Sequence, residues 1–295
     1  MSTTAARAVT TPPPPHPPRP LRRGVALLPS LFTVANLGMG WYAIQQSLLA
    51  LQAPLDAANL LDTAAKAIGW AILLDGLDGR IARMANATSA FGREFDSLAD
   101  IISFGVAPAV MAYVWGLRFL QTTPHAAVAL NRVAQIAVFL FVVAGAARLA
   151  RFNISTHESH PSNPGKPGKR YFVGMPIPAA AGTIAAIVHF FASPTFFFMS
   201  VNTSSVLAGF WLALVVGLAF LMVSTWRFYS FKEIDLGRRH PYVFMVSLAA
   251  FMAGIWYYSE AVLMGLVVVY VGSALVWRAI YYLHLYRQHR AAAEL

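Results

Sequence analysis

The most informative part of this 295-residue chain reads DGLDGRIARMANATSAFGREFDSLAD, residues 75–100. It carries four aspartates, and strongly apolar sequence precedes and follows it, so we expect these acids to lie within or at the edge of a membrane. Asp75 and Asp78 are three residues apart, and Asp96 and Asp100 are four apart, so each pair shares one face of its own helix. Carboxylates at membrane depth are costly, and they indicate a functional site.

Two pairs of carboxylates without Cys or His are typical of a site for a hard divalent cation. An alternative interpretation pairs the acids with Arg80, Arg83 and Arg93 in structural salt bridges. That interpretation gives no role to Gly79 and Gly92, which allow close approach of a ligand or of a neighbouring helix. A cation site at headgroup level with arginines nearby suits the pyrophosphate of a nucleotide-activated lipid.

The composition excludes an ordinary soluble domain. The chain is 58% hydrophobic and 12% charged, with a mean hydropathy of +0.57, which is typical of a helical membrane protein with several spans. Its formal charge of +10 comes mainly from Lys and Arg at the ends of apolar segments. That distribution follows the positive-inside rule and favours contact with anionic lipids over contact with nucleic acid.

The apolar segments predict an all-α integral membrane protein with about eight transmembrane helices. Basic residues at both ends of the chain place both termini in the cytoplasm, and the aspartates at the cytoplasmic ends of spans two and three. Residues 1–20 are expected to form a disordered, proline-rich cytoplasmic tail, and residues 286–295 a second cytoplasmic tail. The predicted spans cover approximately residues 27–51, 62–85, 92–117, 131–153, 173–193, 205–229, 242–259 and 261–284.

The acidic region contains a longer pattern, D-x2-D-G-x2-A-R-x8-G-x3-D-x3-D. Its fixed positions are occupied by Asp75, Asp78, Gly79, Ala82, Arg83, Gly92, Asp96 and Asp100. This pattern resembles the signature of the CDP-alcohol phosphotransferases, which are integral membrane enzymes of phospholipid synthesis. Segments 27–44, 148–153, 171–182 and 221–232 are also similar to the subgroup of this family that uses serine, the CDP-diacylglycerol–serine O-phosphatidyltransferases.

The resemblance implies an architecture and a reaction. A six-helix catalytic domain is expected over residues 21–232, with a C-terminal pair of transmembrane helices over residues 233–285. The implied reaction joins CDP-diacylglycerol and L-serine to give phosphatidylserine and CMP. The family further implies a homodimer, and a prokaryotic plasma membrane is the expected location.

The resemblance also implies roles for the signature residues. Asp75, Asp78 and Asp96 bind one or two divalent metal ions, Mg²⁺ or Mn²⁺, with Ca²⁺ as a substitute. Asp100 also lies near the metal ions and is the general base that takes the proton of the acceptor hydroxyl. The residues expected to bind the CDP-lipid are Asp78, Gly79, Ala82, Arg83 and Gly92.

Four further basic residues are candidates for an anion site. Arg148, Arg151, Arg227 and Lys232 lie at the cytoplasmic ends of predicted spans, and any of them could hold the serine carboxylate or a lipid phosphate. The alternative role for each is to set the topology.

Two other functions stay open from the residues. The same chemistry could use glycerol phosphate, inositol phosphate or choline as the acceptor. A cation transporter is a remote alternative, disfavoured because the acids gather at one face of the membrane and no inverted repeat is visible.

Overall fold

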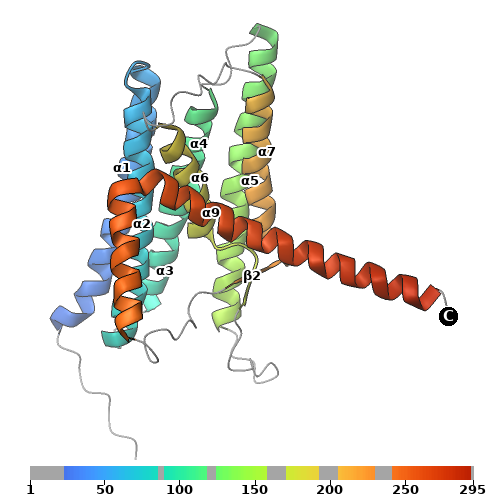
Figure 1. Cartoon of the computed structure of the whole chain (residues 1–295). Coiled ribbons are helices and arrows are strands. Elements are labelled where there is room, and N and C mark those ends of the chain that lie inside the picture. The colour runs from blue at the N-terminus through green and yellow to red at the C-terminus, as the bar shows by residue number, and fades with distance from the viewer. Residues whose placement is uncertain are drawn as a thin grey trace, which may run out of the picture.

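The computed structural model describes residues 23–85, 90–117, 124–157, 171–192, 205–229 and 241–293. Figure 1 shows a bundle of long helices, with a C-terminal helix that crosses the bundle obliquely and extends past it. The predicted spans fall mainly on helices, so the prediction of a helical membrane protein is confirmed, although span 92–117 covers α3, η1 and α4 and the last two spans share α9. The helices are α1 (Arg23–Gln52), α2 (Ala57–Ala85), α3 (Ala90–Asp100), α4 (Ala107–Leu117), α5 (Pro124–His157), α6 (Ile177–Ala192), α7 (Ser205–Val223) and α9 (Pro241–Ala293).

A small antiparallel sheet corrects the purely helical expectation. Strand β1 (Tyr171–Val173) pairs with β2 (Arg227–Tyr229), so the predicted spans 173–193 and 205–229 extend too far at these ends. Gly174 follows β1 at a φ of +79°, and a Cβ there would lie 2.6 Å from the carbonyl oxygen of Met222. Only glycine fits this turn, which leads the chain from the sheet into α6.

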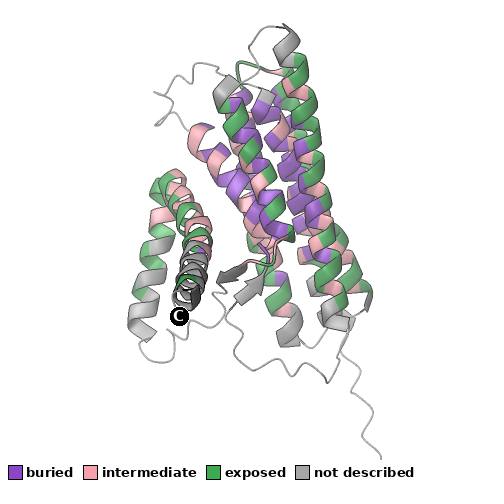
Figure 2. Cartoon of the chain, turned by 90° about the vertical axis from the view of Figure 1, so that its right-hand side faces the viewer, coloured by how far each residue is buried: buried purple, intermediate pink, exposed green. Residues whose placement is uncertain are grey.

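Figure 2 shows buried residues along the inside of the bundle and exposed residues along its outer faces. Buried alanines, such as Ala43 on α1 and Ala64 on α2, let these two helices pack closely along their length. Large side chains such as Trp70, Phe139 and Phe210 face outward. A bundle with this arrangement is suited to a lipid environment, and the chain is an integral membrane protein.

Several helices are long and apolar enough to cross a bilayer. In the described part of the chain, four helical segments meet this criterion by length and composition: Ala57–Ile81, Phe91–Gly116, Val128–Ile154 and Met252–Val276. Helices α6 and α7 contain shorter apolar stretches, Ile177–Ala192 and Leu207–Val223.

A π-helix, η1 (Ile101–Val106), joins α3 to α4 directly after Asp100. Insertion of a wider turn into an α-helix is frequent at functional sites, because it changes which side chains face a neighbouring helix. Here the wider turn buries Ser103 against α1, where its hydroxyl donates to the carbonyl oxygen of Asn36 over 3.0 Å. The end of α3 that carries Asp100 is therefore attached to α1.

Helix α9 consists of two helices joined at Tyr258, whose φ of −138° and ψ of 45° are not helical. A polar network holds this bend against the bundle. His189 of α6, 4% exposed, is hydrogen-bonded through Nε2 to the Ser259 hydroxyl over 2.9 Å and pairs through Nδ1 with Asp62 of α2. Lys66 completes the network through an ion pair of 2.6 Å with Asp62.

Replacement of His189 by leucine should destabilise the protein. The substitution leaves Ser259 without its partner and removes one of the two partners of Asp62, in surroundings that offer little water. The expected cost is about 1–3 kcal/mol. A thermal unfolding curve in detergent measures it, with Gln45→Leu at an exposed position as the control. An unfolding temperature equal to that of the control would show that the network does not hold α9.

Candidate functional site

Three of the four predicted aspartates meet at one end of the bundle. Asp75 comes from the last part of α2, and Asp96 and Asp100 come from α3. One carboxylate oxygen from each of the three lies within 4.8 Å of the others. The chain reverses direction between α2 and α3, so Asp75 of α2 meets Asp96 and Asp100 near the C-terminal end of α3.

The cluster fits a divalent cation. All three residues are only partly buried, so ions can reach them. The Asp100 Oδ1 atom is buried and has no hydrogen-bond partner in the described part of the chain. Three carboxylates so close together repel one another unless a cation lies between them, and oxygen-only donors suit Mg²⁺ or Mn²⁺. The residues present therefore match the predicted metal.

Asp78 lies close by but outside this group of three. It is 5% exposed, and its Oδ2 accepts a hydrogen bond from the Thr33 hydroxyl of α1. Its Oδ1 is buried without a hydrogen-bond partner among the described residues, and its charge acts on Asp96. A role of Asp78 as a metal ligand stays a prediction.

Helix α1 contributes polar groups that were not predicted from the sequence. Asn36 is fully buried, and its side chain lies beside the Asp100 carboxylate without reaching the full geometry of a hydrogen bond. The available signal was weak, because Thr33 and Asn36 are simply two polar residues three apart in an apolar span. Together they give the site a wall that faces the acids from α1.

The glycine of the DGR segment borders open space. A Cβ built on Gly79 would meet no atom within 4 Å, so packing against a neighbouring helix does not explain this glycine. The salt-bridge interpretation is weakened, because Arg80 and Arg93 are exposed. Ala82 and Arg83 lie in the last turns of α2, and Gly92 lies in the first turn of α3. The side chains of Ala82 and Arg83 lie outside the described part of the structure.

Among the described side chains of the four basic candidates, that of Arg148 is the one near the acids. It lies partly buried on α5, within electrostatic range of Asp100, and its Nε is buried without a hydrogen-bond partner in the described part of the chain. Arg151 is exposed. The backbone of Arg227 belongs to β2, and its side chain and the whole of Lys232 lie outside the described residues.

Asn153 and Ser97 connect α5 to α3. The Asn153 amide donates to the Ser97 hydroxyl over 2.9 Å, and that hydroxyl donates to the Arg93 carbonyl oxygen over 3.0 Å. Ser97 thus holds α5 beside the helix that carries Asp96 and Asp100. Arg148 lies on the same helix as Asn153, five residues before it.

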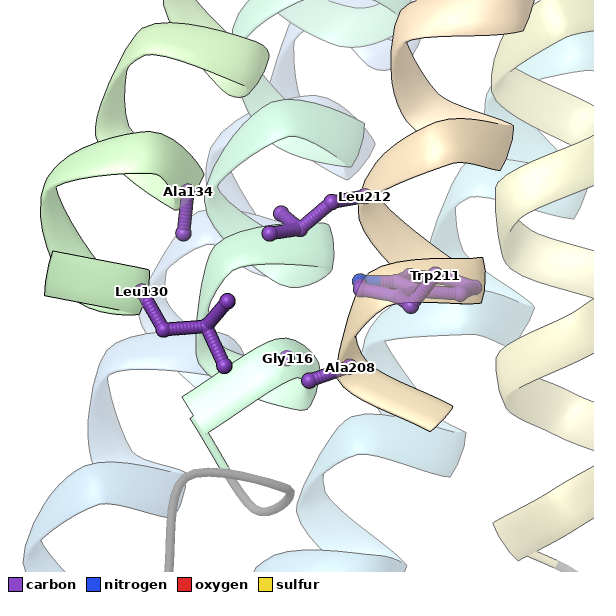
Figure 3. A pocket seen from close by; sticks show the side chains of 6 residues that line it. All are labelled: Gly116, Leu130, Ala134, Ala208, Trp211 and Leu212. Carbon is purple, nitrogen blue, oxygen red and sulfur yellow. The ribbon is translucent and has the colours of Figure 1, made fainter. Parts of the chain in front are cut away.

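A separate small cavity lies between α4, α5 and α7 (Figure 3). Its lining is apolar, and the Trp211 indole, which borders it, donates to the Ala112 carbonyl oxygen over 2.9 Å. The lining contains no charged or titratable side chain, so it offers no chemistry for a reaction. The lining residues are Gly116, Leu130, Ala134, Ala208, Trp211 and Leu212.

Comparison with known proteins gives a consistent result. The profile of a family described as CDP-alcohol phosphatidyltransferase matches residues 26–218, which include all four aspartates. The chain is 36% identical over 209 residues to the CDP-diacylglycerol–serine O-phosphatidyltransferase of Helicobacter pylori (strain J99), an alignment that covers 70% of this chain and 74% of that protein.

Two further relatives extend this comparison. The protein of the same name from Mycobacterium leprae is 35% identical over 236 residues, covering 79% of this chain and 69% of that protein. The archaetidylserine synthase of Methanothermobacter thermautotrophicus is 35% identical over 161 residues, covering 54% of this chain and 56% of that protein.

Proposed function

Because the chain belongs to the CDP-alcohol phosphatidyltransferase family, we propose that it transfers a phosphatidyl group from CDP-diacylglycerol to L-serine, giving phosphatidylserine and CMP. The observation that carries this proposal is the cluster of Asp75, Asp96 and Asp100 at one end of a membrane-embedded bundle. Serine is proposed as the acceptor because the bacterial relatives described above carry serine in their names.

Asp75, Asp96 and Asp100 would hold the metal, with Asp78 as a further ligand. A bound Mg²⁺ or Mn²⁺ ion neutralises the charge of the pyrophosphate and of the departing CMP. The buried, unpartnered Oδ1 atoms of Asp78 and Asp100 support this assignment, because such oxygens are stabilised by a cation or a hydrogen-bond donor. One or two ions could be held by these ligands, and Ca²⁺ is a possible substitute by donor chemistry.

Asp100 is proposed as the general base. Its carboxylate takes the proton of the serine hydroxyl, whose oxygen forms a bond to the phosphorus next to diacylglycerol. The bond between that phosphorus and the bridging oxygen breaks, and CMP leaves with the bridging oxygen. Asn36 lies beside Asp100 and would keep its carboxylate turned toward the acceptor. A single displacement of this kind depends mainly on positioning and on charge stabilisation.

The nucleotide is proposed to bind along the last turns of α2 and the first turn of α3. The open space beside Gly79 supports this placement, because a nucleotide needs close approach to the backbone there. Arg83 would contact a phosphate. The full proposed set is Asp78, Gly79, Ala82, Arg83 and Gly92.

The finer topology is also part of the proposal. We place eight spans in the plasma membrane, with both termini and the aspartates on the cytoplasmic side, on the distribution of Lys and Arg. The same basic residues favour contact with anionic lipids. A homodimer is proposed on the family resemblance alone.

Release of CMP from CDP-diacylglycerol by the purified protein tests the proposed function. We expect release with Mg²⁺ or Mn²⁺ and L-serine, and loss of release when EDTA removes the metal. Glycerol 3-phosphate, inositol phosphate and choline are assayed in parallel. Release with one of these and not with serine would keep the site and overturn the acceptor. No release with any acceptor, from folded protein, would overturn the enzyme assignment.

A further inference from the structure

Helix α1 is hydrogen-bonded to both parts of the chain that carry the aspartates. The Thr33 hydroxyl donates a hydrogen bond to Oδ2 of Asp78 on α2. Three residues further along α1, the Asn36 carbonyl oxygen accepts a hydrogen bond of 3.0 Å from Ser103 of η1, the segment that follows α3. Residues three apart share one face of a helix, so the same face of α1 makes both contacts.

The packing at this face of α1 leaves the Thr33 side chain little freedom. Thr33 is 3% exposed, and Asn36 is fully buried. At Gly40, a Cβ would lie 2.7 Å from the Cα of Ser103, so the backbones of α1 and η1 are in close contact. Threonine is branched at Cβ, which restricts its χ1 angle. The Thr33 hydroxyl is therefore held in a defined position on a rigid helix face.

The two carboxylate oxygens of Asp78 have different surroundings. Oδ2 accepts the hydrogen bond from Thr33, whereas Oδ1 is buried and has no hydrogen-bond partner among the described residues. Asp78 lies one helical turn after Asp75, which belongs to the cluster of three acids. A buried anionic oxygen of this kind is stabilised by a cation or by a hydrogen-bond donor. The bond from Thr33 fixes the rotation of the carboxylate, and so it fixes the direction of Oδ1.

We infer that Thr33 is a positioning residue of the metal site, which holds Asp78 by Oδ2 so that Oδ1 is presented to the cation. The inference rests on the proposed function, in which Asp78 is a further metal ligand. Helix α1 contains no acidic residue, so its part in the site is to orient a ligand that α2 supplies. Hydrogen-bond partners of this kind orient the groups that bind a metal and contribute to its affinity.

Binding of Mn²⁺ to the purified protein tests the inference without any turnover. The electron paramagnetic resonance signal of free Mn²⁺ gives the Kd, measured with and without CMP. Thr33→Val keeps the branched shape of the side chain and removes only the hydroxyl, so the Kd should rise about 10- to 100-fold. Thr33→Ser restores the donor and should return most of the affinity. An unchanged Kd in Thr33→Val would overturn the inference.

A double-mutant cycle separates positioning from a general effect on the fold. Asp78→Asn should itself weaken Mn²⁺ binding, because it removes a charged oxygen ligand. In the Asp78→Asn background, Thr33→Val should change the Kd by no more than about twofold, since Thr33 acts only through Asp78. A merely structural role would lower the unfolding temperature and raise the Kd equally in both backgrounds. Multiplication of the two single effects would therefore overturn the inference.

Thr63→Val serves as the matched control. Thr63 lies on α2, 12 residues before Asp75 and about 18 Å from it along the axis, and its hydroxyl donates to the Asn59 carbonyl oxygen of the same helix over 2.8 Å. Its Kd for Mn²⁺ should equal that of wild type, and a rise as large as in Thr33→Val would overturn the inference. Wild-type protein that binds Mn²⁺ but releases no CMP would overturn the proposed function and leave the cycle to decide the inference. Absence of Mn²⁺ binding by the wild-type protein would overturn the inference itself.

Discussion

Asp100→Asn is expected to reduce CMP release by about 10²- to 10⁴-fold, which is the usual contribution of a general base. Asparagine retains the size of the side chain and one oxygen that can bind a metal ion, but its amide cannot take the proton of the acceptor hydroxyl. Binding of CDP-diacylglycerol should therefore persist. Initial rates of CMP release, together with protection of the protein by CDP-diacylglycerol against thermal unfolding, separate the two effects.

Glu94→Gln is the control for this experiment. Glu94 lies on the same helix and is exposed, so the neutral variant should keep the wild-type rate. A wild-type rate in Asp100→Asn would assign the base elsewhere. Loss of both turnover and CDP-diacylglycerol binding would make Asp100 chiefly a binding residue.

Gly40→Ala should impair both stability and activity, because α1 touches the π-helix η1 at this point. A Cβ on Gly40 would lie 2.5 Å from the Ser103 hydroxyl oxygen and 2.7 Å from its Cα. The second contact is with backbone, so a change of rotamer cannot relieve it and the two helices must separate. Overpacking of this kind costs about 1–3 kcal/mol.

The separation also acts on catalysis, because Asn36 of α1 lies beside Asp100. We expect the rate of CMP release to fall about tenfold or more, since small displacements at a site have large effects on rate. Gly38→Ala on the same helix is the control: no atom lies within 4 Å of its Cβ position. Equal unfolding temperatures and rates for the two variants would show that the contact with Ser103 can relax freely.

Local patterns were sufficient to predict the helices and the meeting of Asp75 with Asp96 and Asp100. The spacing of three and four residues places two acids on one face of a helix, and the apolar flanks identify the helices. Both features involve only neighbouring parts of the chain, so they can be read from the sequence. The candidate metal site formed by these three acids was predicted for the same reason. The role of its fourth predicted member, Asp78, stays a prediction. The hydrogen bond that Asp78 accepts from Thr33 could not be predicted, because it depends on how α1 packs against α2.

The features that were missed depend on contacts between distant segments. Asn36 and His189 acquire their surroundings from helices far away in the chain: 64 residues separate Asn36 from Asp100, and 127 residues separate His189 from Asp62. The sheet pairs residues 171–173 with 227–229 across two intervening helices. Periodicity and turn signals carry no information about such partners, because each segment alone reads as an ordinary apolar helix or a loop.

Helix α2 carries two polar groups at a fixed distance along its axis: Asp62 of the network with His189, and Asp75 of the acidic cluster. Asp62 and Asp75 are 13 residues apart on one helix, which corresponds to about 20 Å along its axis. The hydrocarbon layer of a bilayer is about 30 Å thick. At least one of these two polar groups therefore lies below the headgroups unless the lipid thins around the protein. The acyl-chain length of the surrounding lipid sets the thickness of the hydrocarbon layer around α2. It therefore determines how far into the membrane the phosphates of CDP-diacylglycerol must move to reach the aspartates.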